Sequence, residues 1–350
     1  AEFFAESIER VRKWGFNSAG AWTQTSAPEI AELIRQRHLP YTPFLPTPSK
    51  AAEVMYRVWD PFDPNIEQIL DSTFSPLAAR ADDPQIIGYF LVNEPRLQNV
   101  PRVVPTLKAS QSPSKARLVQ MLQEKYGSID QFNKAWEMSA ASFEELNEAP
   151  LTVATRQAST DVSAFYEEFL ERRYSLVHRY FRKYDANHLL IGDRWMVDTA
   201  NSEVLLRTAG KYYDIISVNY YTAGVDKGFL KRLHDWSSGR PLMLSEFYYS
   251  SGDQGLMITG RTLANQRDRG LAYRNYVEQA ASTGFVVGIQ WFNHLDQSAT
   301  GRWFQGYNGE GAANGLVNVV DRPYKPFLEE VTKTNYDIYS VLMGEKSPFV

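Results

Sequence analysis

Two glutamates in this sequence, Glu94 and Glu246, each stand at the end of an apolar run. Residues 86–92 (IIGYFLV) are almost all apolar, which is typical of a strand buried on both faces. Pro95 has no amide hydrogen to give to a sheet, so we expect this strand to end beside Glu94. Residues 242–247 (LMLSEF) predict a second buried strand, which brings Glu246 to its end in the same way.

Two carboxyl groups at the carboxyl ends of parallel strands can act on one bond. Parallel α/β sheets and barrels carry their active sites at that end of the strands. Carboxyl groups about 5–5.5 Å apart suit a double displacement on a glycoside, in which one group protonates the leaving oxygen and the other attacks the anomeric carbon. A single strand-end glutamate is more often structural, for example as a helix cap, but two together favour catalysis.

Further polar and aromatic residues near the predicted strand ends are candidates for binding a sugar. Asn93 could donate a hydrogen bond to a sugar 2-hydroxyl, or it could cap the backbone at the strand end. Tyr221 could orient the attacking carboxylate, and Trp291 could form the floor under the sugar, because aromatic faces stack on sugar rings. Both side chains would also be ordinary in the rim or the core of a fold. The other candidates are polar loop residues, which could equally be solvated, and strand-end residues with weaker claims: Asn293, His294, Asp296, Gln297, Trp22, Arg194 and Trp195.

Other reaction classes lack the residues that they need. The chain has no cysteine, which excludes disulfides, thiolate zinc sites and cysteine nucleophiles. Its five histidines do not occur at HExxH or another metal-binding spacing. The sequence also contains no GxSxG elbow and no phosphate-binding loop. We therefore expect no metal and no cofactor.

Composition narrows the range of partners. The net charge is −4, and no run of lysine or arginine suggests binding to nucleic acid or to a membrane surface. No stretch of 18 apolar residues occurs, so we expect no membrane-spanning segment. The chain begins at Ala1 without a methionine, so we expect a segment upstream to have been removed and the protein to be secreted or periplasmic. The sequence does not indicate an oligomeric state.

Strand and helix patterns alternate along the chain, which predicts a parallel α/β sheet. A run of predicted helices over about residues 100–160 interrupts this alternation after the Glu94 strand. A doubly wound sheet and a (β/α)8 TIM barrel both fit the alternation. The lack of a glycine-rich loop after the first strand and the polar or aromatic ends of six of the seven strands favour the barrel. The predicted strands lie at residues 16–22, 41–45, 86–92, 188–191, 214–218, 241–244 and 285–289.

A barrel needs an eighth strand, and we expect it to precede the helix predicted over residues 3–14. Counting that missing strand as the first places Glu94 on strand four and Glu246 on strand seven, with the helical insertion after strand four. On this interpretation residues 1–350 form a single catalytic barrel domain.

Several stretches resemble a known group of enzymes. The NEP sequence at residues 93–95, with a second strand-end glutamate and a later strand-end tryptophan, resembles the retaining (β/α)8 glycoside hydrolases of clan A. Residues 124–136 (EKYGSIDQFNKAW) resemble a segment found in family 42 β-galactosidases and family 50 β-agarases. Residues 290–302 (QWFNHLDQSATGR) and 314–324 (NGLVNVVDRPY) are most similar to family 50 β-agarases.

The resemblance implies a retaining glycoside hydrolase with Glu94 as the acid/base and Glu246 as the nucleophile. It also implies that the substrate is a β-linked, galactose-containing polysaccharide such as agarose. Two alternatives stay open: a β-galactosidase-like exo-enzyme that acts on galacto-oligosaccharides, and a non-catalytic barrel that binds carbohydrate.

Overall fold

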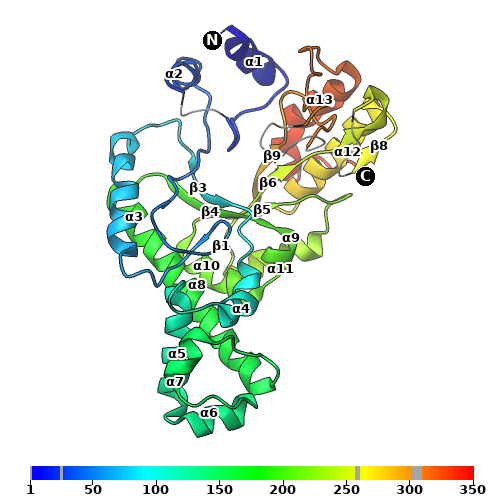
Figure 1. The fold of residues 1–350 in the computed structure, drawn as a ribbon. Helices are drawn as coiled ribbons and strands as arrows, with labels where there is room; N and C mark the ends of the chain where they lie inside the picture. Colours follow the sequence, from blue (N-terminus) through cyan, green and yellow to red (C-terminus); the bar gives the residue numbers. More distant parts are fainter. Residues whose placement is uncertain (1, 24–26, 257–260, 302–309) are drawn as a thin grey trace.

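A computed structural model describes residues 2–23, 27–256, 261–301 and 310–350; Arg302, which ends one of the agarase-like stretches, lies outside these ranges. A five-stranded sheet lies at the centre of the molecule (Figure 1), and all of its strands are parallel. This confirms the expected parallel α/β sheet. The strands, in their spatial order, are β3 (Gly88–Asn93), β4 (Leu189–Met196), β5 (Ile216–Asn219), β6 (Leu242–Phe247) and β9 (Val286–Trp291).

Two segments before β3 continue the sheet by isolated bridges. The sequence predicted full strands over residues 16–22 and 41–45, but both segments pair only at single positions. Pro40 and Pro43 explain the second case, because a proline has no amide hydrogen for a ladder. The parallel bridges are Ala19–Tyr41, Tyr41–Ile86 and Phe44–Phe90.

One face of the sheet carries a small apolar cluster that is separate from the main core of the molecule. Neighbouring strands and both bridged segments contribute to it. At the edge of the sheet opposite β3, Gln290 of β9 donates from Nε2 to the Thr42 hydroxyl at 2.7 Å. The sheet is therefore curved enough for its last strand to reach the segment that precedes β3. The cluster consists of Ala21, Phe44, Phe90, Ile191, Ile215 and Met243.

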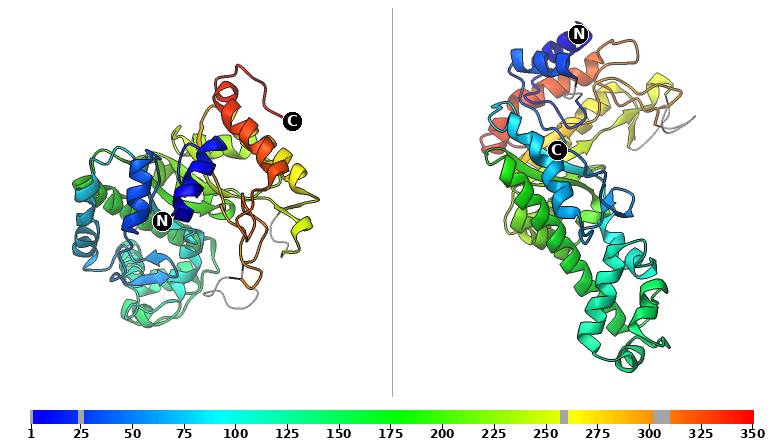
Figure 2. Two further views of the ribbon diagram at one scale, coloured as in Figure 1. Left: turned by 90° about the horizontal axis from the view of Figure 1, so that it is seen from above. Right: turned by 60° about the vertical axis from the view of Figure 1, so that its left-hand side comes forward.

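Helices lie between the strands in sequence (Figures 1 and 2). They carry many of the residues of the main hydrophobic core. The helices expected over residues 3–14, from Pro28 and over residues 325–343 are all present. No helix in the described ranges is both long enough and apolar enough to cross a membrane. The α-helices are α1 (Glu2–Lys13), α2 (Pro28–Gln36), α3 (Ile66–Phe74), α8 (Arg156–Tyr184), α9 (Val197–Ala200), α10 (Glu203–Tyr212), α11 (Lys227–Trp236), α12 (Gln266–Ala281) and α13 (Lys325–Leu342). The 3-10 helices are η1 (Ser75–Arg80), η2 (Leu97–Asn99), η3 (Val104–Thr106) and η4 (Gly252–Gln254).

The helical insertion expected after the Glu94 strand is present, and it projects from the sheet as a separate lobe at the bottom of Figure 1. The first half of α8 joins it to the body of the molecule. Inside the lobe, the buried Asp161 carboxylate accepts hydrogen bonds from the Tyr126 hydroxyl at 2.6 Å and from the Trp136 indole at 2.9 Å. The helices of the lobe are α4 (Val100–Val103), α5 (Pro113–Tyr126), α6 (Ile129–Trp136) and α7 (Phe143–Glu148).

Two small sheets were not predicted from the sequence. The antiparallel hairpin of β1 (Glu53–Met55) and β2 (Val58–Trp59) lies before α3. The strands β7 (Ser250–Ser251) and β8 (Thr262–Leu263) pair in parallel after β6. Strands of two or three residues are too short to produce a clear alternation of apolar and polar residues.

Gly192 lies within β4, two residues before Arg194. Its φ of 80° lies in the left-handed region, and the β3–β4 register shifts between Tyr89 and Phe90, where Phe90 pairs with Gly192. A β-carbon at this position would lie 2.2 Å from the buried Tyr213 ring. The register shifts back between Phe90 and Asn93, so Asn93 still pairs with Arg194. The bulge changes the alternation of faces instead, because Ile191 and Arg194 both lie on the side of Phe90.

We expect Gly192→Ala to lower the free energy of unfolding by roughly 3 kcal/mol, from left-handed strain together with overpacking against Tyr213. Gly127→Ala is the matched control, because Gly127 has a φ of 70° and a β-carbon added there would have nothing within 4 Å. That variant should lose only the strain, about 1–2 kcal/mol. Urea denaturation of the three proteins measures both values, and equal losses would contradict the steric role of Tyr213.

Candidate active site

Glu246 lies at the end of β6, and only 8% of the residue is exposed. The Tyr221 hydroxyl donates to Oε1 at 2.6 Å. The Trp22 indole donates to Oε2 at 2.7 Å, and Arg194 Nη2 lies 2.9 Å from the same oxygen. A carboxylate buried to this extent needs such donors to replace its water, and charge-assisted bonds are the strong ones. The three donors hold the carboxylate in one orientation.

Burial shifts the pKa values of Tyr221 and Arg194, the two titratable side chains that contact Glu246. Burial raises the pKa of Tyr221, and the adjacent Glu246 charge raises it further. The Tyr221 hydroxyl therefore keeps its proton and remains a hydrogen-bond donor to the carboxylate. Burial lowers the pKa of Arg194, while the charge of Glu246 acts in the opposite direction.

Glu94 follows β3 directly and is half-buried. Its backbone is in the left-handed region, with a φ of 52°, and its amide donates to the Arg194 carbonyl at 2.9 Å. Asn219 donates from Nδ2 to Oε1 at 3.0 Å. No hydrogen bond among the described residues uses Oε2 of Glu94. A carboxyl group with one oxygen held and one oxygen available can exchange a proton with a ligand.

A polar network joins the two glutamates. The Asn93 side-chain oxygen accepts from Arg194 Nη1 at 2.9 Å and from Asn219 Nδ2 at 3.2 Å. Because Arg194 also contacts Glu246 and Asn219 also contacts Glu94, both carboxyl groups belong to one connected cluster. The strand register supports this arrangement, since Asn93 pairs with Arg194 and Asn219 pairs with Glu246.

Two members of this network, Asn219 and Ser245, were not among the predicted site residues. Asn219 is fully buried, and its side-chain oxygen accepts a hydrogen bond from the Ser245 hydroxyl at 2.9 Å. Both residues lie at the end of a predicted buried strand, beside Tyr221 and Glu246 in the sequence. That position was the signal that could have identified them.

Arg194 was expected to bind substrate, and in the structure its guanidinium is held by protein groups at the cavity wall. The residue is 1% exposed, and its guanidinium contacts Glu246, Asn93 and the Ser245 carbonyl. It therefore acts on the site through the groups that it holds. The neighbouring Trp195 is fully buried on the opposite side of β4, against the rings of Tyr174 and Tyr213.

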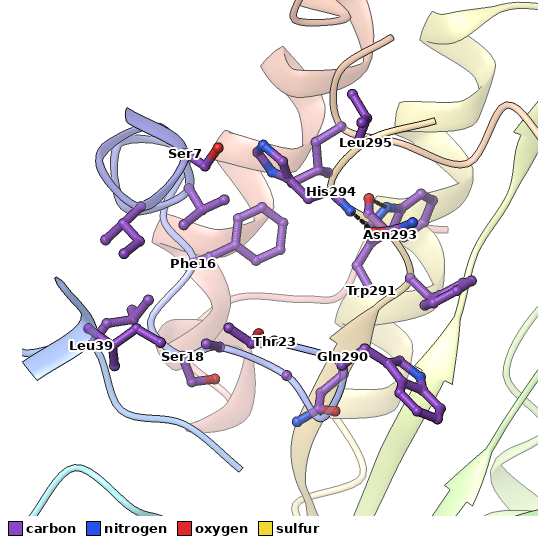
Figure 3. Close-up of a pocket in the computed structure, with 18 of the residues that line it drawn as sticks. Ser7, Phe16, Ser18, Thr23, Leu39, Gln290, Trp291, Asn293, His294 and Leu295 are labelled. Carbon is purple, nitrogen blue, oxygen red and sulfur yellow. Dashed lines mark hydrogen bonds between the residues drawn. The ribbon is translucent and has the colours of Figure 1, made fainter. Parts of the chain in front are cut away.

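A cavity of about 370 Å³ extends from this cluster (Figure 3). Glu246, Arg194 and Trp22 line it, together with β9, the 292–295 loop, the 16–23 segment and residues of α1 and α2. Trp22 is 50% exposed, so its ring remains accessible while its indole nitrogen contacts Glu246. Trp291 also lines the cavity, and its indole donates to the carbonyls of Asn293 and Asn314. The Trp291 ring also packs against Phe247, Tyr273 and Phe327.

His294 lines the cavity near α1, where it faces Ser7 in Figure 3. Its ring is stacked on Trp14 with centroids 6.5 Å apart, and it meets the edge of Phe3 at 6.3 Å. Neither ring nitrogen has a hydrogen-bond partner in the described part of the chain. Burial lowers the pKa of His294, which favours the neutral ring. The adjacent Asn293 accepts the His294 backbone amide through its side-chain oxygen.

Asp296 and Gln297 were expected to contact sugar hydroxyls, but their contacts do not support that expectation. Both side chains are buried. Asp296 accepts hydrogen bonds from the Gly315 amide at 2.7 Å and from the Tyr324 hydroxyl. Gln297 donates to Glu310 and accepts from the Ala312 amide. The 293–297 loop turns inward onto residues 310–324, and these two side chains hold it there.

The described residues contain no group of three or more histidine, cysteine, aspartate or glutamate side chains that could hold a metal ion.

We expect His294→Gln to make stability less sensitive to acid. A histidine whose pKa is lowered in the folded state contributes stability above its unfolded pKa of about 6.5, and this contribution is lost as the pH falls below that value. The wild type should therefore lose more thermal stability than the variant between about pH 7 and pH 5. The other four histidines are present in both proteins and cancel in the comparison. A difference in Tm that does not change with pH would contradict this role of burial.

Two curated proteins are similar in sequence to this chain, whereas no family model matches it. β-Agarase B of Vibrio sp. (strain JT0107) is 28% identical over 352 residues, which cover 95% of this chain and 36% of that protein. β-Agarase A of the same organism is 23% identical over 365 residues, with the same two coverages. The chain thus spans little more than a third of the length of the curated relatives it matches.

Solved structures give a consistent result. The structure of an exo-β-agarase is 25% identical, has a TM-score of 0.83, and matches over 98% of this chain and 47% of that chain. The agarase AgWH50C is 25% identical, with a TM-score of 0.80 and coverages of 97% and 49%. A β-galactosidase from the psychrophilic Marinomonas ef1 is 15% identical, with a TM-score of 0.66 and coverages of 98% and 58%, and shares the fold. The comparisons confirm the expected resemblance to β-agarases, within a fold shared with β-galactosidases.

Proposed function

We propose that this chain is a retaining glycoside hydrolase that cleaves β-galactosidic linkages in a galactose-containing polysaccharide such as agarose. The observation that carries the proposal is the cluster at the strand ends, where one polar network connects Glu94 and Glu246 beside a cavity with aromatic walls. Likeness to β-agarases over 95% of the chain supports the substrate class.

In the first step the Glu246 carboxylate attacks the anomeric carbon. The bond from that carbon to the glycosidic oxygen breaks, and Glu94 gives its proton to the leaving oxygen. Tyr221, Trp22 and Arg194 hold the attacking carboxylate in place, which lowers the entropy that must be lost on the way to the transition state.

In the second step a water molecule replaces the enzyme carboxylate at the anomeric carbon. Glu94 now accepts a proton from the water, and Glu246 is released as a carboxylate. Carboxylate attack and proton transfer account for both steps without a cofactor. The available Oε2 of Glu94 is the atom through which this proton would move in each direction.

The sugar contacts are part of the same proposal. Asn93 would donate from Nδ2 to the 2-hydroxyl, because no hydrogen bond among the described residues uses that group. Trp22 and Trp291 would present ring faces to the sugar from the cavity wall. Arg194 is a positioning residue that acts through Glu246 and Asn93. A polymeric substrate does not cross membranes, so we propose that the protein acts outside the cytoplasm, in a secreted or periplasmic form.

We infer further that the sheet is part of a (β/α)8 barrel and that residues 1–350 form one catalytic domain. The small apolar cluster on one face of the sheet and the Gln290–Thr42 contact support closure, since barrels fill their interior with side chains from neighbouring strands. The remaining strand position would lie between β9 and residues 16–20. An experimental structure with an open sheet would contradict this inference.

The substrate proposal is tested with agarose, porphyran and nitrophenyl β-galactoside, followed by analysis of the products. We expect hydrolysis of galactose-containing substrates and much slower hydrolysis of the matching β-glucoside, because a missing or inverted hydroxyl leaves buried polar partners unpaired. Equal rates on the two sugars would remove the agarase-like proposal. Cleavage of the aryl galactoside without cleavage of either polysaccharide would instead favour a β-galactosidase-like exo-enzyme.

Substitution of the two glutamates tests their roles. Glu94→Gln should slow hydrolysis of a substrate with a sugar leaving group by roughly 10²–10⁴-fold, and it should affect an aryl galactoside much less, because nitrophenolate leaves without a proton. Glu246→Ala should lose activity on both, and added azide should restore turnover with inversion at the anomeric carbon. Glu203→Ala, on the exposed start of α10, is the control. Retention of activity by Glu246→Ala without azide would contradict the nucleophile assignment.

A further inference from the structure

The turn of the β1–β2 hairpin presents an aromatic ring close to the site. Tyr56 is 75% exposed, the largest value for an aromatic side chain among the described residues. The rest of the hairpin is firmly packed, since Val58 and Trp59 are buried and the Arg173 guanidinium lies 4.4 Å from the Trp59 ring centroid.

Arg57 connects this ring to the catalytic cluster. Its guanidinium carbon lies 4.8 Å from the Tyr56 ring centroid, and its Nη1 donates to the Asn93 carbonyl at 3.0 Å. Asn93 is the residue immediately before Glu94. The Tyr56 ring is therefore held on the Glu94 side of the site, whereas Trp22 contacts Glu246.

The backbone of the turn supports a role for the Arg57 side chain. Arg57 has a φ of 64°, a conformation that costs about 1–3 kcal/mol for a residue other than glycine. Glycine or asparagine is the usual choice at such a turn position. Arginine there supplies both the cation under the Tyr56 ring and the hydrogen bond to Asn93, which neither of the usual residues can supply.

We propose that the Tyr56–Arg57 turn binds the sugar unit on the leaving-group side of the scissile bond. This inference rests on the proposed function, because the acid/base residue identifies that side: Glu94 protonates the oxygen that departs with the leaving group. The ligand is a pyranose unit of a β-galactoside oligosaccharide. Its apolar face lies on the Tyr56 ring, and its hydroxyls accept from the remaining N–H groups of Arg57.

The test compares substrates with and without a sugar on the leaving-group side. Tyr56→Ala should lower kcat/KM for an agarose-derived tetrasaccharide about tenfold, the equivalent of one good stacking contact. It should leave the hydrolysis of β-galactosyl fluoride unchanged, since fluoride occupies no sugar site. Tyr56→Phe keeps the ring and should behave as the wild type. Tyr336→Ala is the matched control, because Tyr336 on α13 is 66% exposed and lies on a different face.

A binding measurement separates this inference from the proposed function. In a Glu246→Gln background, calorimetric titration with the tetrasaccharide should show an affinity about tenfold weaker when Tyr56 is alanine. An unchanged affinity would overturn the inference even if hydrolysis is confirmed. Equal losses of activity on the fluoride and the tetrasaccharide would also overturn it, because the ring would then affect the site as a whole. Failure of the wild type to hydrolyse any galactoside would overturn only the proposed function, since the titration needs no turnover.

Discussion

The ion pair between Arg194 and Glu246 is the interaction on which the rest of the site depends. Both groups are buried, and removing either one would leave an uncompensated charge beside an apolar interior. The pair is stable because each partner has further contacts: Tyr221 and Trp22 donate to the carboxylate, and Asn93 accepts from the guanidinium. A site built in this way is rigid before substrate arrives, which is what electrostatic catalysis requires.

Much of the fold and the position of both glutamates could be predicted because they depend on local patterns. Apolar runs that end at Glu94 and Glu246 indicate buried strands, and parallel strands place their carboxyl ends at one edge. The face that a side chain occupies was harder to predict. Gly192 introduces a bulge in β4, and the alternation of faces after it cannot be counted from the sequence. Arg194 therefore looked like a substrate contact, although it lies beneath the site.

The polar loop after β9 shows a second limit. Asp296 and Gln297 are polar, close together in sequence and flanked by aromatic residues, so they were expected to bind sugar hydroxyls. Their actual partners, Gly315, Tyr324 and Ala312, lie 15 to 28 residues away. Burial raises the pKa of Asp296, and the nearby buried Arg269, which donates to the Gly315 carbonyl, acts in the opposite direction. Such long-range pairing has no local signature in the sequence.

Three residues with left-handed backbone contribute to the site. Glu94, Arg57 and Gly192 all have φ values between 52° and 80°, and each controls a different contact of the same cluster. Glu94 turns out of its strand to meet Asn219, and Arg57 brings the hairpin to the Asn93 carbonyl. Gly192 changes the alternation of faces in β4, so that Arg194 lies on the side of Phe90. Strain of this kind persists only where surrounding contacts impose it. The two that are not glycine, Glu94 and Arg57, are linked through Asn93, whose side chain and carbonyl serve both. Asn93 is therefore the residue through which the hairpin and the two carboxyl groups share one rigid framework.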